Sequence, residues 1–127
     1  MDFEQIVKNE FEKLNLPKRP FIEINNLKSG VYVVEVNIGD KMDLEQLGSI
    51  VFSYDYRHNK FYLSWIGLMQ SIRKKGYAGA MIEAMENVAK KMNIKKIESN
   101  TPVVNPTSIA AYGYTSSCYG LYKNLNV

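Results

Sequence analysis

The chain has 127 residues, of which 46% are hydrophobic and 23% are charged, and its formal net charge is +3. This size and balance predict one globular domain, residues 1–127, with a hydrophobic core of its own. They exclude a membrane-spanning helix, because no run approaches about 18 uninterrupted apolar residues. The mild positive charge makes nucleic acid an unlikely partner.

A single cysteine, Cys118, and a single histidine, His58, limit the chemistry of the chain. One cysteine cannot form an intramolecular disulfide, which favours a reducing, cytoplasmic location. The two residues cannot supply a Cys/His zinc site, so no metal is expected. Charged residues near the N-terminus, such as Asp2, Glu4 and Lys8, argue against a secretory signal.

The first element predicted in chain order is a helix over residues 2–15, where apolar residues recur every three or four positions. Asp2 is placed to cap this helix with Gln5 in the capping-box position, and Pro17 and Pro20 end it. Four strand candidates rich in Val, Ile, Phe and Tyr follow, and the short turns between them favour antiparallel neighbours. They cover residues 21–27, 31–38, 47–54 and 60–68.

The pattern then changes to a helical period. Residues 76 to about 92 read as an amphipathic helix, with Asn93 as a left-handed stop, and residues 94–101 read as another strand. The unit 60–101 is therefore a right-handed crossover with two parallel strands. A last helix begins at residue 105, and residues 119–127 are compatible with a short strand or with continued helix. The fold class is α/β (α+β), with a mixed, mostly antiparallel central sheet and flanking helices.

The basic segment between the fourth strand and the long helix is the most informative stretch, and it runs Arg73-Lys74-Lys75-Gly76-Tyr77-Ala78. Backbone N–H groups at a helix N-terminus lack intrahelical partners, and the helix dipole favours negative charge there. The two lysines add positive charge, and the glycine permits a tight turn and a close approach of the backbone to a ligand. The segment predicts a site for a phosphorylated ligand.

This segment matches the Arg/Gln-x-x-Gly-x-Gly/Ala signature, and the chain resembles the GNAT family, the GCN5-related N-acetyltransferases. The likeness extends over residues 48–112, in the order strand, motif, amphipathic helix, strand and a helix that starts at Asn105. The resemblance implies a GNAT-like fold with a strand–helix–strand acetyl-CoA unit. It also implies an acetyl-CoA-dependent N-acetyltransferase that uses no metal and whose acceptor is a primary amine of a protein or a small molecule. Transfer would occur by direct attack in a ternary complex.

The resemblance further implies roles for individual residues. The Leu68 N–H would polarise the acetyl carbonyl as an oxyanion-type donor. Tyr112 lies two helical turns after Asn105, on the same helix face, and would protonate the departing thiolate. The remaining implied contacts are with the pantetheine arm and the pyrophosphate. The cofactor-binding residues expected on this basis are Leu68, Met69, Gln70, Arg73, Lys74, Lys75, Gly76, Tyr77, Ala78, Gly79, Asn105 and Ser108.

The chain departs from the family at the general base and at the tail. Many members carry a Glu on the strand before the motif, where this chain has Tyr62. Glu98 on the next strand is then the nearest carboxylate by topology, and water or bulk solvent is the alternative base. The usual Gly-Phe after the catalytic Tyr is missing, so the closing strands are expected to be shortened or replaced, with Tyr114 or Tyr119 as alternative acids. Gly67 is the expected position of a strand bulge.

Two other functions stay open at this point. The missing strand glutamate and the altered tail are compatible with a non-catalytic acyl-CoA-binding module. The basic pairs Lys90/Lys91 and Lys95/Lys96, together with the basic loop, are compatible with a small nucleic-acid-binding domain, which salt-dependent binding would reveal. The four tyrosines between residues 112 and 122 are compatible with a substrate wall, a homodimer contact or simple packing.

Overall fold

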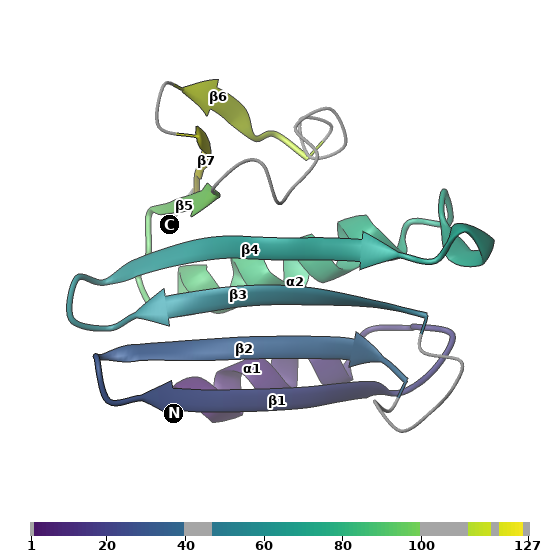
Figure 1. Cartoon of the computed structure of the whole chain (residues 1–127), viewed down its shortest axis with the longest axis horizontal. Coiled ribbons are helices and arrows are strands. Elements are labelled where there is room, and N and C mark those ends of the chain that lie inside the picture. The colour runs from purple at the N-terminus through teal and green to yellow at the C-terminus, as the bar shows by residue number, and fades with distance from the viewer. Residues whose placement is uncertain (1, 40–46, 100–111, 118–119, 126–127) are drawn as a thin grey trace.

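The computed structural model describes residues 2–39, 47–99, 112–117 and 120–125 (Figure 1). Its seven strands form one sheet in the order β1-β2-β3-β4-β5-β7-β6, and every neighbouring pair is antiparallel except the parallel pair β4 and β5. The predicted mixed, mostly antiparallel sheet is confirmed. The elements are α1 (Phe3–Glu12), β1 (Pro20–Leu27), β2 (Val31–Ile38), β3 (Gly48–Asp55), β4 (Lys60–Leu68), the 3-10 turn η1 (Gln70–Ile72), α2 (Tyr77–Lys91), β5 (Lys96–Ser99), β6 (Thr115–Ser117) and β7 (Gly120–Asn124).

The two helices begin and end where their local chemistry requires. The Asp2 carboxylate accepts the backbone N–H of Gln5 at 2.8 Å and so caps α1. The Gln5 side chain donates to Asn9 instead of returning to the cap, so the capping box is only half formed. Helix α2 starts after Gly76 and stops before Asn93, and both of these residues have positive φ. No helix within the described ranges is long and apolar enough to cross a membrane.

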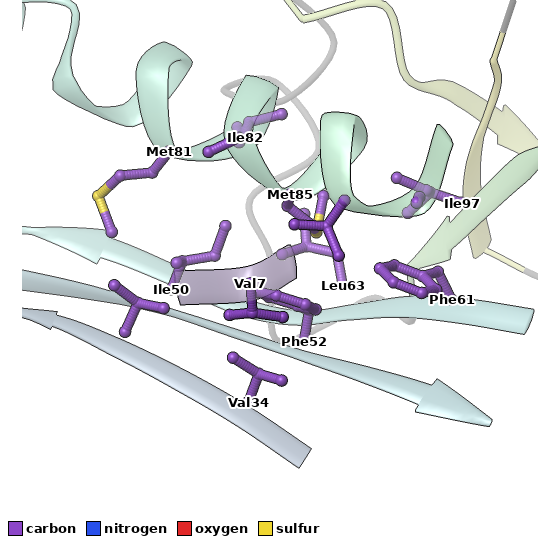
Figure 2. Close-up of a cluster of buried hydrophobic side chains, with 14 of the residues drawn as sticks. Val7, Val34, Ile50, Phe52, Phe61, Leu63, Met81, Ile82, Met85 and Ile97 are labelled. Atoms are coloured by element: carbon purple, nitrogen blue, oxygen red, sulfur yellow. The ribbon is translucent and has the colours of Figure 1, made fainter. Parts of the chain in front are cut away.

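Both helices lie on one face of the sheet, behind the strands in the view of Figure 1. Figure 2 shows α2 placing Met81 and Met85 against the strand residues beneath it. These side chains are fully buried, and so are the strand residues that meet them. Met81 and Met85 therefore belong to the hydrophobic core. The strand residues on this face that Figure 2 labels are Val34, Ile50, Phe52, Phe61, Leu63 and Ile97.

The other face of the sheet, called the open face below, bears no helix among the residues that the structure describes. One row of neighbouring side chains crosses this face, with one residue from each of the strands β1 to β4. The register places Glu23 beside Glu35, Glu35 beside Val51, and Val51 beside Trp65. Trp65 is 45% exposed. Because side chains alternate between the faces of a strand, this row is separated from the core by the backbone alone.

A buried carboxylate joins the two helices. Glu10 of α1 is 1% exposed, and its oxygens meet Lys91 of α2 at 2.5 Å and Lys13 at 3.0 Å. Burial by itself would raise the pKa of Glu10, but the hydrogen bonds and positive charges of Lys91 and Lys13 outweigh it and hold the pKa below its ordinary value of 4.5. The ionised carboxylate therefore stabilises the contact between α1 and α2.

Glu10→Gln is expected to lower the free energy of unfolding at pH 7 by about 1–2 kcal/mol, as for a lost charged hydrogen bond. A group whose pKa is lower in the folded state stabilises the fold above its unfolded pKa. This contribution is lost as the pH falls through the folded pKa. The difference between wild type and variant should therefore be full at pH 7 and vanish at acid pH, as measured by urea unfolding at each pH. Glu12→Gln, at an exposed neighbour, is the control, and an equal effect at pH 7 and at strongly acid pH would contradict the assignment.

Candidate functional site

Strands β4 and β5 pair for only part of their length. The parallel register joins Phe61–Leu63 of β4 to β5, and the Ser99 hydroxyl donates to the Leu63 carbonyl at 2.8 Å where the pairing ends. β4 continues to Leu68. Within the described ranges, no strand pairs with the edge of residues 64–68 that faces away from β3. We call this stretch the free edge of β4.

A bulge sets which backbone groups face the free edge. The register between β3 and β4 shifts between Val51 and Phe52, so that Ser64 is an extra residue in β4. The bulge expected at Gly67 therefore lies three residues earlier. After an extra residue, each following residue directs its N–H and C=O to the side opposite to the one that simple alternation predicts. The direction of the N–H groups beyond the bulge must therefore be taken from their hydrogen bonds and not from the sequence.

Those hydrogen bonds point two N–H groups at the free edge. The Met69 N–H donates to the Leu47 carbonyl of the β3 side at 2.9 Å. Because successive residues of a strand direct their backbone groups to opposite sides, Leu68 and Ile66 face away from β3. The Leu68 carbonyl also faces away from β3, because it accepts a hydrogen bond from Arg73 Nε at 2.9 Å. Sequence reasoning identified the Leu68 N–H and missed that of Ile66, because only the bulge reveals its direction.

The basic loop that follows the strand has the backbone of an anion site. Lys74 and Gly76 both have positive φ, at 63° and 85°. No N–H from residue 74 to 79 has an acceptor in the described protein. An ideal Cβ on Gly76 would meet nothing within 4 Å, so the space in front of the loop is open. Left-handed geometry at the exposed Lys74 costs about 1–2 kcal/mol. Such strain is typical of a functional site, and a run of N–H groups at a helix N-terminus beside two lysines suits a pyrophosphate.

Two of the predicted cofactor contacts are already engaged with the protein. Arg73 uses its Nε to hold the end of β4, which fixes the loop relative to the strand. The Met69 N–H donates to Leu47 and the Met69 carbonyl accepts from the Ile72 N–H at 3.1 Å, so what this residue offers a ligand is its side chain, which is 51% exposed. The predicted contacts Asn105 and Ser108 lie outside the described residues.

Tyr112 stands at the first turn of α2. An ideal Cβ on Gly79 would lie 3.0 Å from Tyr112 Cε1, so the ring packs directly on this glycine. The Lys123 ammonium donates to the Tyr112 carbonyl at 2.7 Å and holds the backbone there. The half-buried Tyr112 ring therefore lies beside the N-terminus of α2, next to the basic loop.

A buried carboxylate anchors the same segment. Glu86 of α2 accepts from Lys123 at 3.0 Å and from the Tyr114 hydroxyl at 3.1 Å. Burial, and then the negative charge of Glu86, strongly raise the pKa of Tyr114. This phenol therefore stays protonated and bonded to Glu86, which argues against it as the alternative acid. Tyr119 and Cys118 lie outside the described residues.

Glu98 lies on the open face of β5, beside Tyr62 in the register. It meets Lys96 at 3.3 Å, and Lys96 also lies over the Tyr122 ring. Leu68 lies six residues after Tyr62 in β4, or five once the extra residue of the bulge is left out. At about 3.3 Å per residue this is a separation of about 17 Å along the strand. Direct proton transfer from an amine at Leu68 to Glu98 is out of reach at that separation.

Other polar clusters in the described residues have simpler roles. His58 lies in the turn before β4 and meets Asp55 at 2.8 Å, where both side chains are near the surface. The hydrogen bonds from the His58 ring and N–H hold the pKa of Asp55 below its usual range. No group of three or more His, Cys, Asp or Glu side chains is placed to hold a metal ion in the part of the chain described.

Comparisons with known proteins point to one family. The model of the acetyltransferase (GNAT) family matches residues 2–114. No curated protein sequence matches the chain. An acetyltransferase from Bacillus cereus is similar in structure, with a TM-score of 0.59 and 14% identity over 96% of this chain and 87% of its own.

Two further solved structures share the same fold. Ard1 from Thermoplasma volcanium has a TM-score of 0.56 and 14% identity over 75% of this chain and 71% of its own. Elp3 from Methanocaldococcus infernus has a TM-score of 0.63 and 12% identity over 94% of this chain and 34% of its own. At such identities the likeness shows the fold alone, whereas the family model covers nearly the whole length from the first helix to Tyr114. The chain therefore belongs to the GNAT acetyltransferase family.

Proposed function

We propose that this chain transfers the acetyl group of acetyl-CoA to a primary amine by direct attack in a ternary complex. The observation that carries the proposal is the free edge of β4, which leads into a loop whose N–H groups have no acceptor among the described residues. A pyrophosphate held by residues 74–79 would allow the pantetheine arm to run along this edge. The acetyl carbonyl would then lie at the N–H groups of Ile66 and Leu68.

The chemistry requires little beyond positioning and charge stabilisation. The amine nitrogen attacks the carbonyl carbon, and the negative charge that develops on the carbonyl oxygen is met by the N–H groups of Leu68 and Ile66. A C–N bond forms and the C–S bond breaks. We assign to Tyr112 the role of general acid, whose hydroxyl donates a proton to the departing sulfur. We assign to water the role of accepting the proton from the amine, because Tyr62 stands where a carboxylate would be needed and Glu98 lies about 17 Å away along the strand.

Glu98→Gln tests that last assignment. The variant is expected to keep the wild-type shape of the profile of kcat/KM against pH, because a carboxylate beyond hydrogen-bond reach cannot set its acid limb. Lys96→Met, which removes the ion-pair partner of Glu98, serves as the matched control. Loss of the acid limb in Glu98→Gln alone would make Glu98 the base, acting through water.

The proposed function is tested by acetyl-CoA turnover against several classes of amine, detected by the release of free thiol. Peptides with a free N-terminus, lysine peptides, polyamines and amino-sugar antibiotics cover the classes that the sequence leaves open. Steady thiol release that depends on an amine would support the proposal.

Two outcomes would replace the proposal with its rivals. Tight acetyl-CoA binding without thiol release for any amine would favour a non-catalytic acyl-CoA-binding module. The reason to consider such a module is that Tyr62 occupies the position where many family members carry the glutamate base. Steeply salt-dependent binding of DNA or RNA that coenzyme A does not reduce would favour a nucleic-acid-binding domain.

A further inference from the structure

Strand β1 forms one edge of the seven-stranded sheet, and no strand pairs with its outer side among the residues that the structure describes (Figure 1). The strand is eight residues long, and a hollow of about 480 Å³ borders its first residues. Its register with β2 is regular, it contains no lysine, and its one proline stands at the first position. Most of the devices that protect an exposed strand edge are therefore absent, and such an edge is a template for pairing with another strand.

A hydrogen bond to β2 shows which backbone groups face this outer side. The Gly39 N–H donates to the Arg19 carbonyl at 3.4 Å and continues the pairing between β1 and β2 by one residue. Because successive residues of a strand direct their backbone groups to opposite sides, the odd-numbered residues of β1 face β2. Ile22, Ile24 and Asn26 therefore direct both N–H and C=O outward.

Antiparallel pairing of β1 with a second copy of itself satisfies these outward groups in a particular register. When Ile24 faces Ile24 of the second copy, Ile22 faces Asn26 of the second copy. Each outward N–H of one copy then has a carbonyl acceptor on the other. The same register places Phe21 opposite Leu27 of the second copy, so residues 21–27 all take part.

The side chains of the open face favour this register over its neighbours. Phe21 and Leu27 lie on that face and are 38% and 45% exposed. As a non-hydrogen-bonded pair their Cα atoms would be about 4.5 Å apart, where the side chains pack together. Glu23 faces Asn25 of the second copy. A shift of two residues would instead place Glu23 opposite either Glu23 or Leu27 of the second copy, and both pairs are unfavourable.

We propose that the chain forms a homodimer in which the two β1 strands pair antiparallel about a two-fold axis through Ile24. The interface uses the same strand from both copies, so it closes at two copies and does not propagate. With the axis normal to the sheet, the two sheets become one continuous sheet with all helices of both copies on one side. This association does not depend on the proposed acetyl transfer.

Cysteine variants test the register in a Cys118→Ser background, which removes the only native cysteine. Ile24→Cys would place the Cα atoms of the two cysteines about 5.5 Å apart, within the range of a disulfide. Asn26→Cys is the control, because its two copies would lie about 13 Å apart along the strands. We expect mild oxidation to cross-link Ile24→Cys at least tenfold more than Asn26→Cys, although Asn26 is the more exposed residue. No cross-link in Ile24→Cys, or equal cross-linking of the two variants, would overturn the proposal.

Sedimentation equilibrium over a range of protein concentrations measures the association directly. The weight-average mass should rise from 14.6 kDa, the mass of one chain, to twice that value and no further. Leu27→Lys sets a charge against Phe21 of the second copy and should weaken the dimer at least tenfold. Ser64→Lys adds the same charge at an exposed position of β4 and should leave the dimer unchanged. The mass of one chain at every concentration, growth beyond two copies, or equal effects of the two lysine variants would overturn the proposal.

Discussion

Gly76→Glu is expected to weaken acetyl-CoA binding more than 100-fold, which corresponds to about 3 kcal/mol or more. Two causes combine. The residue has φ +85°, a conformation that costs a non-glycine residue about 1–2 kcal/mol. The new carboxylate would also stand at the helix entry, among the N–H groups that suit a pyrophosphate, and two negative charges about 4 Å apart repel by several kcal/mol near a protein surface. Calorimetric titration with acetyl-CoA measures the effect.

Two control variants separate the effect of the new charge at residue 76 from the effect of the backbone conformation there and from the effect of adding a charge elsewhere on the protein. Gly76→Asn keeps a residue that tolerates the left-handed conformation and adds no charge, so its loss of affinity should be no more than a few-fold. Ser29→Glu adds the same charge at an exposed turn at the other end of the sheet and should bind acetyl-CoA normally. If Gly76→Glu stays folded and its Kd lies within threefold of wild type, the loop is not the pyrophosphate site.

Tyr112→Phe is expected to lower kcat about 100-fold while leaving the affinity for acetyl-CoA nearly unchanged. The loss follows from removal of a general acid, whose usual contribution is about 100-fold to 10,000-fold. The ring itself remains, so its packing on Gly79 and the hold of Lys123 on the backbone are kept. Single-turnover measurement of thiol release, beside a binding titration, separates the two quantities.

Tyr114→Phe is the matched control, two residues away. It removes the hydrogen bond to the buried Glu86, and we expect it to lower the free energy of unfolding by about 1–2 kcal/mol with turnover within a few-fold of wild type. A large loss of kcat in Tyr114→Phe together with near-normal turnover in Tyr112→Phe would identify Tyr114 as the general acid. Full activity in Tyr112→Phe would move the acid elsewhere.

The regular elements could be predicted because their signals are local. The strand expected at 60–68 is β4, and the four-strand antiparallel order follows from turns too short for any other connection. Helix α2 has its predicted limits because Gly76 and Asn93 have the left-handed conformations that start and stop it. The N-terminal helix is shorter than the predicted 2–15, since it ends at Glu12 and the chain turns before Pro17.

The details of the site could not be predicted because they depend on pairing between distant strands. A bulge at Ser64 has no local signal, yet it directs the Ile66 and Leu68 N–H groups at the free edge. Glu98 lies on the predicted strand, but only the register shows how far it is from Leu68. Residues 119–127 were ambiguous because β7 (Gly120–Asn124) is a short strand stabilised by β5, and the short β6 and β7 are the expected closing strands in reduced form.

The one-sided placement of the helices has a consequence for how this protein can evolve. A large-to-small change at a core position such as Ile50 or Leu63 costs about 2–5 kcal/mol. Exposed positions on the opposite face, such as Ser64 and Trp65, tolerate substitution at about 0.5 kcal/mol. Selection can therefore change the chemistry of one face of the sheet while the other preserves the fold, so related chains should keep the core and diverge most rapidly on the open face.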